Sequence, residues 1–162
     1  PGPRPPYTWP VERAPKADAA AIAARHARFE RQAAVLPMLQ AAGVTIMAGT
    51  DAGFLNSFNY PGIGLHDELA LFVDKGLTPA QALASATRAG PDWFGKLDRY
   101  GSADRGKAAD LVLLDRNPLE DIAATRSIHA VILRGTLHDR AALDAMLANT
   151  LAKVATWNAP AQ

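Results

Sequence analysis

The sequence predicts an α/β fold, and three observations on hydrophobic periodicity support this. A stretch of helical periodicity ends at Gly43 and is followed at once by a short apolar run, residues 44–48. Two further helical stretches cover residues 65–74 and 78–90, and beyond residue 100 the pattern changes to short aliphatic runs typical of strands. Because helix, glycine and buried strand in this order form half of a crossover unit, we expect a parallel sheet in the first part of the chain.

The first predicted helix begins at Asp18 and carries its apolar residues on one stripe. The stripe consists of Ile22, His26, Phe29, Ala33 and Leu36. We expect His26 to be a packed helix residue. Pro37 lacks an amide proton, so the helix should kink or restart there, with Pro37 in a first turn. Gly43 is a natural left-handed cap at its end.

The next two helices are predicted from their start and stop signals. Residues 65–74 carry apolar side chains at helical spacing, and Gly76 follows as a cap. Thr78 and Gln81 form a capping box with Pro79 at the first helical position. This second helix should end near Gly90, before a short helical turn through residues 93–94.

The last part of the chain is predicted to contain two strands and a helix. Residues 109–115 and 127–134 are the strands, and Asn117 with Pro118 begins the turn between them. Residues 140–157 are predicted to form an amphipathic helix. Residues 1–16 are rich in proline and are interpreted as an extended lead-in.

Composition and charge restrict the class of protein. Of 162 residues, 49% are hydrophobic and 20% are charged, as in soluble globular chains. A formal net charge of +1 does not indicate binding to nucleic acid or to an anionic membrane, which strongly basic proteins favour. The chain has no cysteine, so disulfides and thiolate metal sites are excluded. No apolar run approaches the roughly 20 residues that span a bilayer.

Asp51 is the candidate catalytic residue. It follows the apolar run at residues 44–48, and the carboxyl ends of buried strands are where α/β barrels and open α/β sheets keep their chemistry. The alternative is structural, since an aspartate after a strand often caps a turn through its own side chain. Spacing alone leaves both interpretations open.

Four motifs, in order, favour the catalytic interpretation. They are Gly49-Thr50-Asp51, Leu65-His-Asp-Glu-Leu69, Lys75-Gly-Leu-Thr-Pro-Ala-Gln-Ala-Leu83, and the run from Gly101 to Ile122 that contains Gly106-Lys107. This ordered set resembles the C-terminal part of the metal-dependent amidohydrolase superfamily, close to its imidazolonepropionase-like and prolidase-like branch. The resemblance extends from about residue 29 to residue 135.

The resemblance implies the C-terminal part of a (β/α)8 TIM-type barrel beside a small β-sandwich. Residues 17–98 would supply the last β/α units of the barrel. Residues 99–139 would supply strands of the sandwich, and residues 140–162 a C-terminal helix and tail. Since a complete barrel takes about 250 residues, and since the chain starts at a proline, we expect it to be part of a longer polypeptide.

The resemblance also implies a role for Asp51 as metal ligand and general base. The metal would be divalent, zinc being the first choice, and its bound water would attack an amide or cyclic amide C–N bond. The other ligands of the family, among them a His-x-His pair, are not found in the sequence. We therefore predict that this chain alone is inactive and needs the N-terminal barrel portion, on the same chain or a partner.

Further residues are candidates for contact with a small-molecule substrate. Phe54, Phe58 and Tyr60 lie in the long segment after Asp51, and loops of that length usually bind something or move. The alternative is that these aromatic rings pack on the barrel rim. His66 begins the helix that follows, and we expect it to reach substrate. Glu68 is favoured near a helix N-terminus by the helix dipole, whatever its function.

Two alternative functions belong to other classes. A trimmed barrel end could be a non-catalytic module for binding or assembly, with exposed apolar faces that favour a homo-oligomer or a partner. The run from Asp110 to Asp115 also resembles the strand of a signalling receiver domain, with Asp115 as phospho-acceptor. Such a domain needs a lysine on a later strand, whereas the lysine that follows, Lys153, falls in the final helix.

Overall fold

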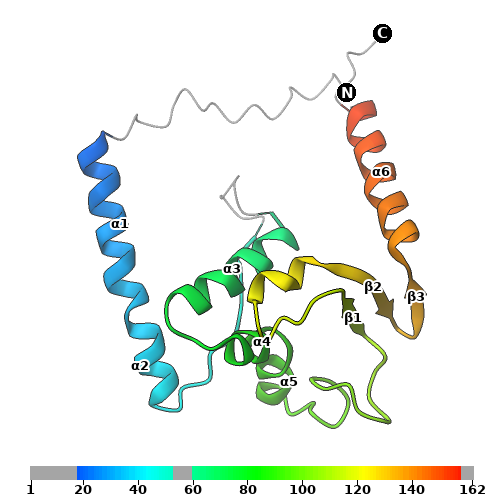
Figure 1. Cartoon of the computed structure of the whole chain (residues 1–162), viewed down its shortest axis with the longest axis horizontal. Coiled ribbons are helices and arrows are strands. Elements are labelled where there is room, and N and C mark those ends of the chain that lie inside the picture. Colours follow the sequence, from blue (N-terminus) through cyan, green and yellow to red (C-terminus); the bar gives the residue numbers. More distant parts are fainter. Residues whose placement is uncertain (1–17, 53–59, 158–162) are drawn as a thin grey trace, which may run out of the picture.

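The computed structural model describes residues 18–52 and 60–157. Its helices are α1 (Ala19–Ala33), α2 (Val35–Ala41), α3 (Ile63–Asp74), α4 (Pro79–Thr87), α5 (Ala89–Trp93) and α6 (Arg140–Trp157), with a 3-10 helix η2 (Ile122–Arg126). Its strands are β1 (Leu111–Leu114), β2 (Ile128–Leu133) and β3 (Thr136–His138). In Figure 1, α1 and α6 extend on opposite sides of a central part that holds α3, α4, α5 and the sheet. The mixed α and β content of the prediction is confirmed.

Helices α1 and α2 form the predicted broken helix. The Asp18 carboxylate accepts a hydrogen bond from the Ala21 amide at 2.6 Å and caps α1. The chain restarts as α2, with Pro37 in its first turn, and Gly43 then adopts a φ of 81°. The apolar stripe was expected to face a core, yet α1 has no buried residue. Helix α1 contacts the rest of the chain through an ion pair, in which the Lys75 ammonium lies 2.9 Å from the Glu30 carboxylate.

Residues 44–50 do not form the predicted strand. They run as an extended segment in which Val44 and Met47 are exposed. The physical reason is that a strand requires a partner, and no described residue pairs with this segment in a ladder. The segment is held instead by the Ala48 amide, which donates to the Ser85 carbonyl of α4 at 3.1 Å. The barrel is therefore not observed among the described residues and stays a prediction.

The buried core joins α3, α4 and η2. Leu69 is 3% exposed and packs with Ala82 and Ile122. The predicted capping box begins α4, with the Thr78 hydroxyl accepting from the Gln81 amide at 3.2 Å and the Gln81 side chain accepting from the Thr78 amide at 2.8 Å. Helices α3 and α4 are therefore both present, with α4 starting at the predicted capping box and α3 ending at Asp74 as predicted.

The helix that follows α4 differs from the prediction in two respects. The helix that begins at residue 78 was expected to continue to about Gly90. Instead, α4 ends at Thr87, and a separate helix, α5, contains Gly90 and Pro91. Proline is tolerated here because Pro91 lies in the first turn of a new helix. Trp93 and Phe94, where a short helical turn was expected, lie at the end of α5 and are exposed.

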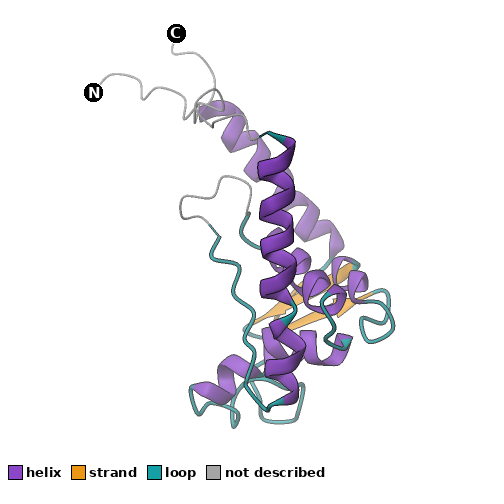
Figure 2. Cartoon of the chain, turned by 90° about the vertical axis from the view of Figure 1, so that its left-hand side faces the viewer, coloured by secondary structure: helices purple, strands orange, loops and turns teal. Residues whose placement is uncertain are grey.

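The sheet has three antiparallel strands in the order β1-β2-β3. The register between β1 and β2 shifts by one residue between Leu113 and Leu114. Strand β3 was not predicted. It is joined to β2 by Arg134 and Gly135, which have φ values of 51° and 81° and form a tight hairpin turn. Figure 2, seen from the α1 side, shows the strands gathered in one small sheet beside the helices.

Helix α6 has the predicted limits but a different environment. The Asp139 carboxylate accepts from the Ala142 amide at 2.8 Å, and the Arg140 guanidinium donates to the Ile128 carbonyl at 3.0 Å. The helix was expected to bury an apolar face, yet it has no buried residue. Leu143, Leu147 and Leu151 follow one another at four-residue spacing on one face, but Leu147 and Leu151 are exposed, so the described residues do not cover that face. Within the described ranges, no helix is long and apolar enough to cross a membrane.

Candidate functional site

Asp51 lies at the end of the extended segment that starts after Gly43. Its side chain is exposed, and its φ of 50° places it in the left-handed region. This conformation disfavours most residues with a side chain, although aspartate tolerates it better than most. Residues outside glycine that hold such a conformation cluster at functional sites, where surrounding contacts must maintain them. The structure thus presents the Asp51 carboxylate on a turn of restricted backbone geometry.

The other predicted site residues lie on other parts of the chain, and their role beside Asp51 stays a prediction. Phe54 and Phe58 lie outside the described residues. Tyr60 is exposed, and its carbonyl accepts from the Gly64 amide at 2.9 Å at the start of α3. His66 lies on α3 and lines a cavity whose lining does not include Asp51 or Tyr60.

The side chain of Glu68 links α3 to the segment that leads into the Asp51 turn. Its Oε1 atom accepts a hydrogen bond from the Gly49 amide at 2.9 Å, and its Oε2 atom is buried without a hydrogen-bond partner in the described structure. Sequence reasoning assigned Glu68 only a favourable position in the helix dipole. The signal that could have found it is the motif Leu65-His-Asp-Glu-Leu69, which stands next to the Gly49-Thr50-Asp51 motif in the ordered set.

His66 is held by the 3-10 helix η2. Its Nδ1 atom lies 3.0 Å from the Thr125 hydroxyl oxygen, and that hydroxyl donates its single proton to the Ile122 carbonyl at 2.9 Å. This assigns the imidazole proton to Nδ1, where it is donated to Thr125. Burial, helped by the Arg126 guanidinium, lowers the pKa of His66, and Asp67 opposes that effect. His66 is therefore neutral at pH 7, with Nε2 as a hydrogen-bond acceptor.

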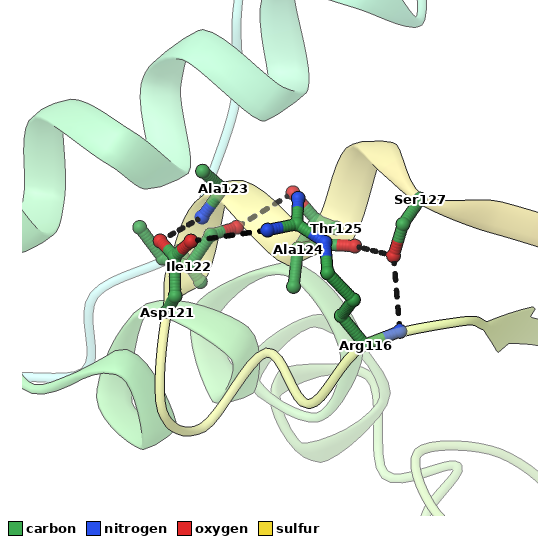
Figure 3. Close-up of polar contacts among 7 residues, drawn as sticks. All are labelled: Arg116, Asp121, Ile122, Ala123, Ala124, Thr125 and Ser127. Atoms are coloured by element: carbon green, nitrogen blue, oxygen red, sulfur yellow. Dashed lines mark hydrogen bonds and ion pairs between the residues drawn. The ribbon is translucent and has the colours of Figure 1, made fainter.

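Polar contacts fix η2 at the position that His66 requires. Figure 3 shows the Asp121 carboxylate accepting from the Ala123 amide at 2.9 Å, at the start of η2. The Ser127 hydroxyl donates to the Ala124 carbonyl at 2.7 Å and accepts from the Arg116 amide at 3.2 Å, which closes the other end. The Arg126 guanidinium also pairs with the Asp67 carboxylate of α3. This cluster ties the sheet region to the helix that carries Glu68.

A cavity of about 830 Å³ lies between α3, α4 and β1. Apolar side chains form most of its wall, and the polar side chains that line it are those of His66, Thr87, Tyr100, Ser102, Asp110 and Thr125. Asp110 is already engaged, since its carboxylate accepts from the Arg134 amide at 2.7 Å. Because Asp51 is not part of the wall, this cavity is a space between the helical part and the sheet, not the candidate catalytic site.

The described residues do not by themselves fit a metal centre. No group of three or more His, Cys, Asp or Glu side chains gathers in residues 18–52 and 60–157. Zinc sites in proteins use three or four protein ligands. Asp51 can therefore be one ligand of such a centre but cannot form it with its described neighbours.

The sheet argues against the receiver-domain alternative. A receiver places its phospho-acceptor after a strand of a parallel sheet, whereas β1 pairs with β2 in antiparallel orientation. The Asp115 carboxylate moreover lies 2.9 Å from Nδ1 of His129 on the neighbouring strand.

Comparisons with known proteins identify the family. The model of the amidohydrolase family matches residues 10–137. Ochratoxinase from Aspergillus niger is 37% identical over 92 residues, which are 56% of this chain and 18% of that protein. The solved structure of molinate hydrolase has a TM-score of 0.57 at 30% identity, covering 64% of this chain and 25% of that one.

A putative prolidase from Bifidobacterium longum has a TM-score of 0.56 at 32% identity and covers 72% of this chain. The chain thus corresponds to 18% of the curated relative and to 30% or less of these solved structures. Since the family model spans most of the sequence, including the Asp51 turn and strands β1 and β2, this chain belongs to the amidohydrolase family.

Proposed function

We propose that this chain is the C-terminal segment of a metal-dependent amidohydrolase that hydrolyses an amide or cyclic amide C–N bond. One observation carries the proposal: the family match includes the turn that presents Asp51, an exposed carboxylate held at a φ of 50°. Two of the similar solved structures, a molinate hydrolase and a putative prolidase, support hydrolysis as the reaction. The substrate is accordingly expected to be a small molecule with an amide-type bond.

The Asp51 carboxylate is proposed as the general base. It accepts a proton from water as the water oxygen adds to the carbonyl carbon, and it then returns that proton to the leaving nitrogen. The C–N bond breaks, so the products are a carboxylic acid and an amine, and Asp51 ends in its starting state.

Asp51 is also proposed as one ligand of a divalent metal, zinc being the first choice. A bound divalent metal lowers the pKa of its water so that hydroxide forms near neutral pH. The remaining ligands would come from a barrel portion beyond the described residues, on the same polypeptide or a partner. The correspondence to 30% or less of the solved relatives supports this requirement. Phe54, Phe58, Tyr60 and His66 stay predictions as substrate contacts.

The experiment compares the 162-residue chain with the polypeptide that carries the rest of the barrel. Zinc content is measured by elemental analysis, and hydrolysis is measured with an Xaa-Pro dipeptide and an N-acyl aromatic amide. We expect no hydrolysis by the short chain. In the longer polypeptide, D51N should lower kcat by about a hundredfold or more.

The matched control is D115N, which changes an exposed aspartate whose partner is His129 and not the Asp51 turn. It should leave kcat unchanged. Stoichiometric zinc and hydrolysis in the short chain would refute the requirement for further ligands, and an active D51N variant would refute the role of Asp51.

A further inference from the structure

We propose that Glu68 is a positioning residue that holds the Asp51 turn in its working geometry. The proposal rests on the proposed role of Asp51 and extends it to a side chain on a different element. It starts from the short polar connection between α3 and the turn, in which Glu68 Oε1 accepts from the Gly49 amide at 2.9 Å.

The path of the extended segment needs anchors, and the neighbouring helices supply them. Among the described residues it pairs with no strand, and the Ala48 amide donates instead to the Ser85 carbonyl at 3.1 Å. The next amide along the chain, that of Gly49, is the one that Glu68 holds. Consecutive amides are thus fixed by α4 and α3, immediately before the turn.

The conformation of Asp51 adds to this need. A non-glycine residue at a φ of 50° is in a disfavoured conformation that persists only when its surroundings maintain it. Gly49 lies two residues before Asp51, so a bond at the Gly49 amide restricts the path by which the chain enters the turn. A carboxylate acceptor gives a stronger bond to an amide than a neutral one does.

Helix α3 makes Glu68 a firm point of attachment. The next residue, Leu69, is 3% exposed in the core, and His66, two positions before Glu68, is held by Thr125 of η2. The second oxygen of Glu68 is buried without a partner in the described structure. A buried acceptor left unpaired is destabilising, so an apolar side chain would serve better if Glu68 only filled space.

The first arm of the test measures amide hydrogen exchange at Gly49 by NMR in the 162-residue chain, and it needs no activity. E68A removes the acceptor, and we expect exchange at Gly49 to rise roughly tenfold or more. E68Q keeps an oxygen at the same reach, so exchange should stay within about threefold of the parent. The matched control is D67N on the same helix, whose carboxylate faces Arg126 and not the turn.

Urea unfolding of each variant measures its global stability. A global loss of stability would also raise exchange at amides throughout α3 and α4. An increase at Gly49 that exceeds the increase at the core amides supports the proposal. Unchanged Gly49 exchange in E68A, or an equal increase in D67N, overturns it.

The second arm measures kcat and KM in the polypeptide that carries the rest of the barrel. E68A should lower kcat about tenfold or more with KM within about twofold. The reason is that the Asp51 carboxylate, which E68A would displace, acts on water and does not bind substrate. E68Q should restore most of kcat, and D67N should leave it unchanged. An unaffected kcat in E68A, or a kcat that E68Q does not restore, overturns the positioning role. If D51N itself retains hydrolysis, the proposed function fails, whatever the Gly49 exchange shows.

Discussion

Leu69 is the residue whose truncation should damage the fold most, and its cost can be worked from the structure. It is 3% exposed and packs with Ala82 and Ile122, with Leu65, Phe72 and Val73 around the cluster. L69A removes three carbon atoms, or about 2.4 kcal/mol at about 0.8 kcal/mol each. The cavity that remains adds to this cost, but the surrounding side chains are only partly buried and can relax into it. We expect a loss of about 2.5–3.5 kcal/mol in the free energy of unfolding, in the lower half of the range for such substitutions.

The assay is urea unfolding followed by far-ultraviolet circular dichroism. The control is L151A, the same chemical change on α6, where the leucine side chain is 71% exposed. Leucine and alanine are both strong helix formers, so L151A should change the free energy of unfolding by less than about 0.5 kcal/mol. A cost below about 1 kcal/mol for L69A, or equal costs for the two variants, would refute the assignment of the core to α3, α4 and η2.

Two further predictions concern the capping box and His66. T78A should lower the free energy of unfolding by about 1 kcal/mol, because the Gln81 amide loses its acceptor, and T78S should restore most of it; urea unfolding measures both. The lowered pKa of His66 means that the folded chain binds its proton less readily than the unfolded chain, so stability should fall as the pH drops below about 6.5. Urea midpoints at pH 7.5 and 5.5 should differ less in H66Q than in the parent, and equal differences would contradict the assignment.

Local signals in the sequence were sufficient for several elements. The limits of residues 140–157 were predicted because helical periodicity starts and stops there, and the start of α4 because Thr78, Pro79 and Gln81 form a recognisable box. The strand at residues 44–48 was wrong, since apolar composition indicates a preference for strand pairing without supplying the partner. The hairpin at Arg134 and Gly135 was missed because arginine gives no signal of a positive φ.

The candidate site was predictable only in part. Asp51 was selected from a motif that includes its immediate neighbours, but the contact of Glu68 with Gly49 joins residues 19 apart. Hydrogen bonds at such a separation depend on how α3 packs, and neither periodicity nor capping rules report that. The engagement of His66 by Thr125 is equally non-local, since these residues are 59 apart.

The register shift between β1 and β2 determines which changes in chain length the sheet can absorb. Leu113 pairs with Ala130 but Leu114 pairs with Ile128, so His129 is the extra residue on β2. Deleting His129 would regularise the ladder and leave every neighbouring side chain on its present face. Deleting one residue elsewhere in β2, such as Ile132, would move the residues on one side of the deletion to the opposite face. Natural variation in length along this strand is therefore expected to concentrate at a single position.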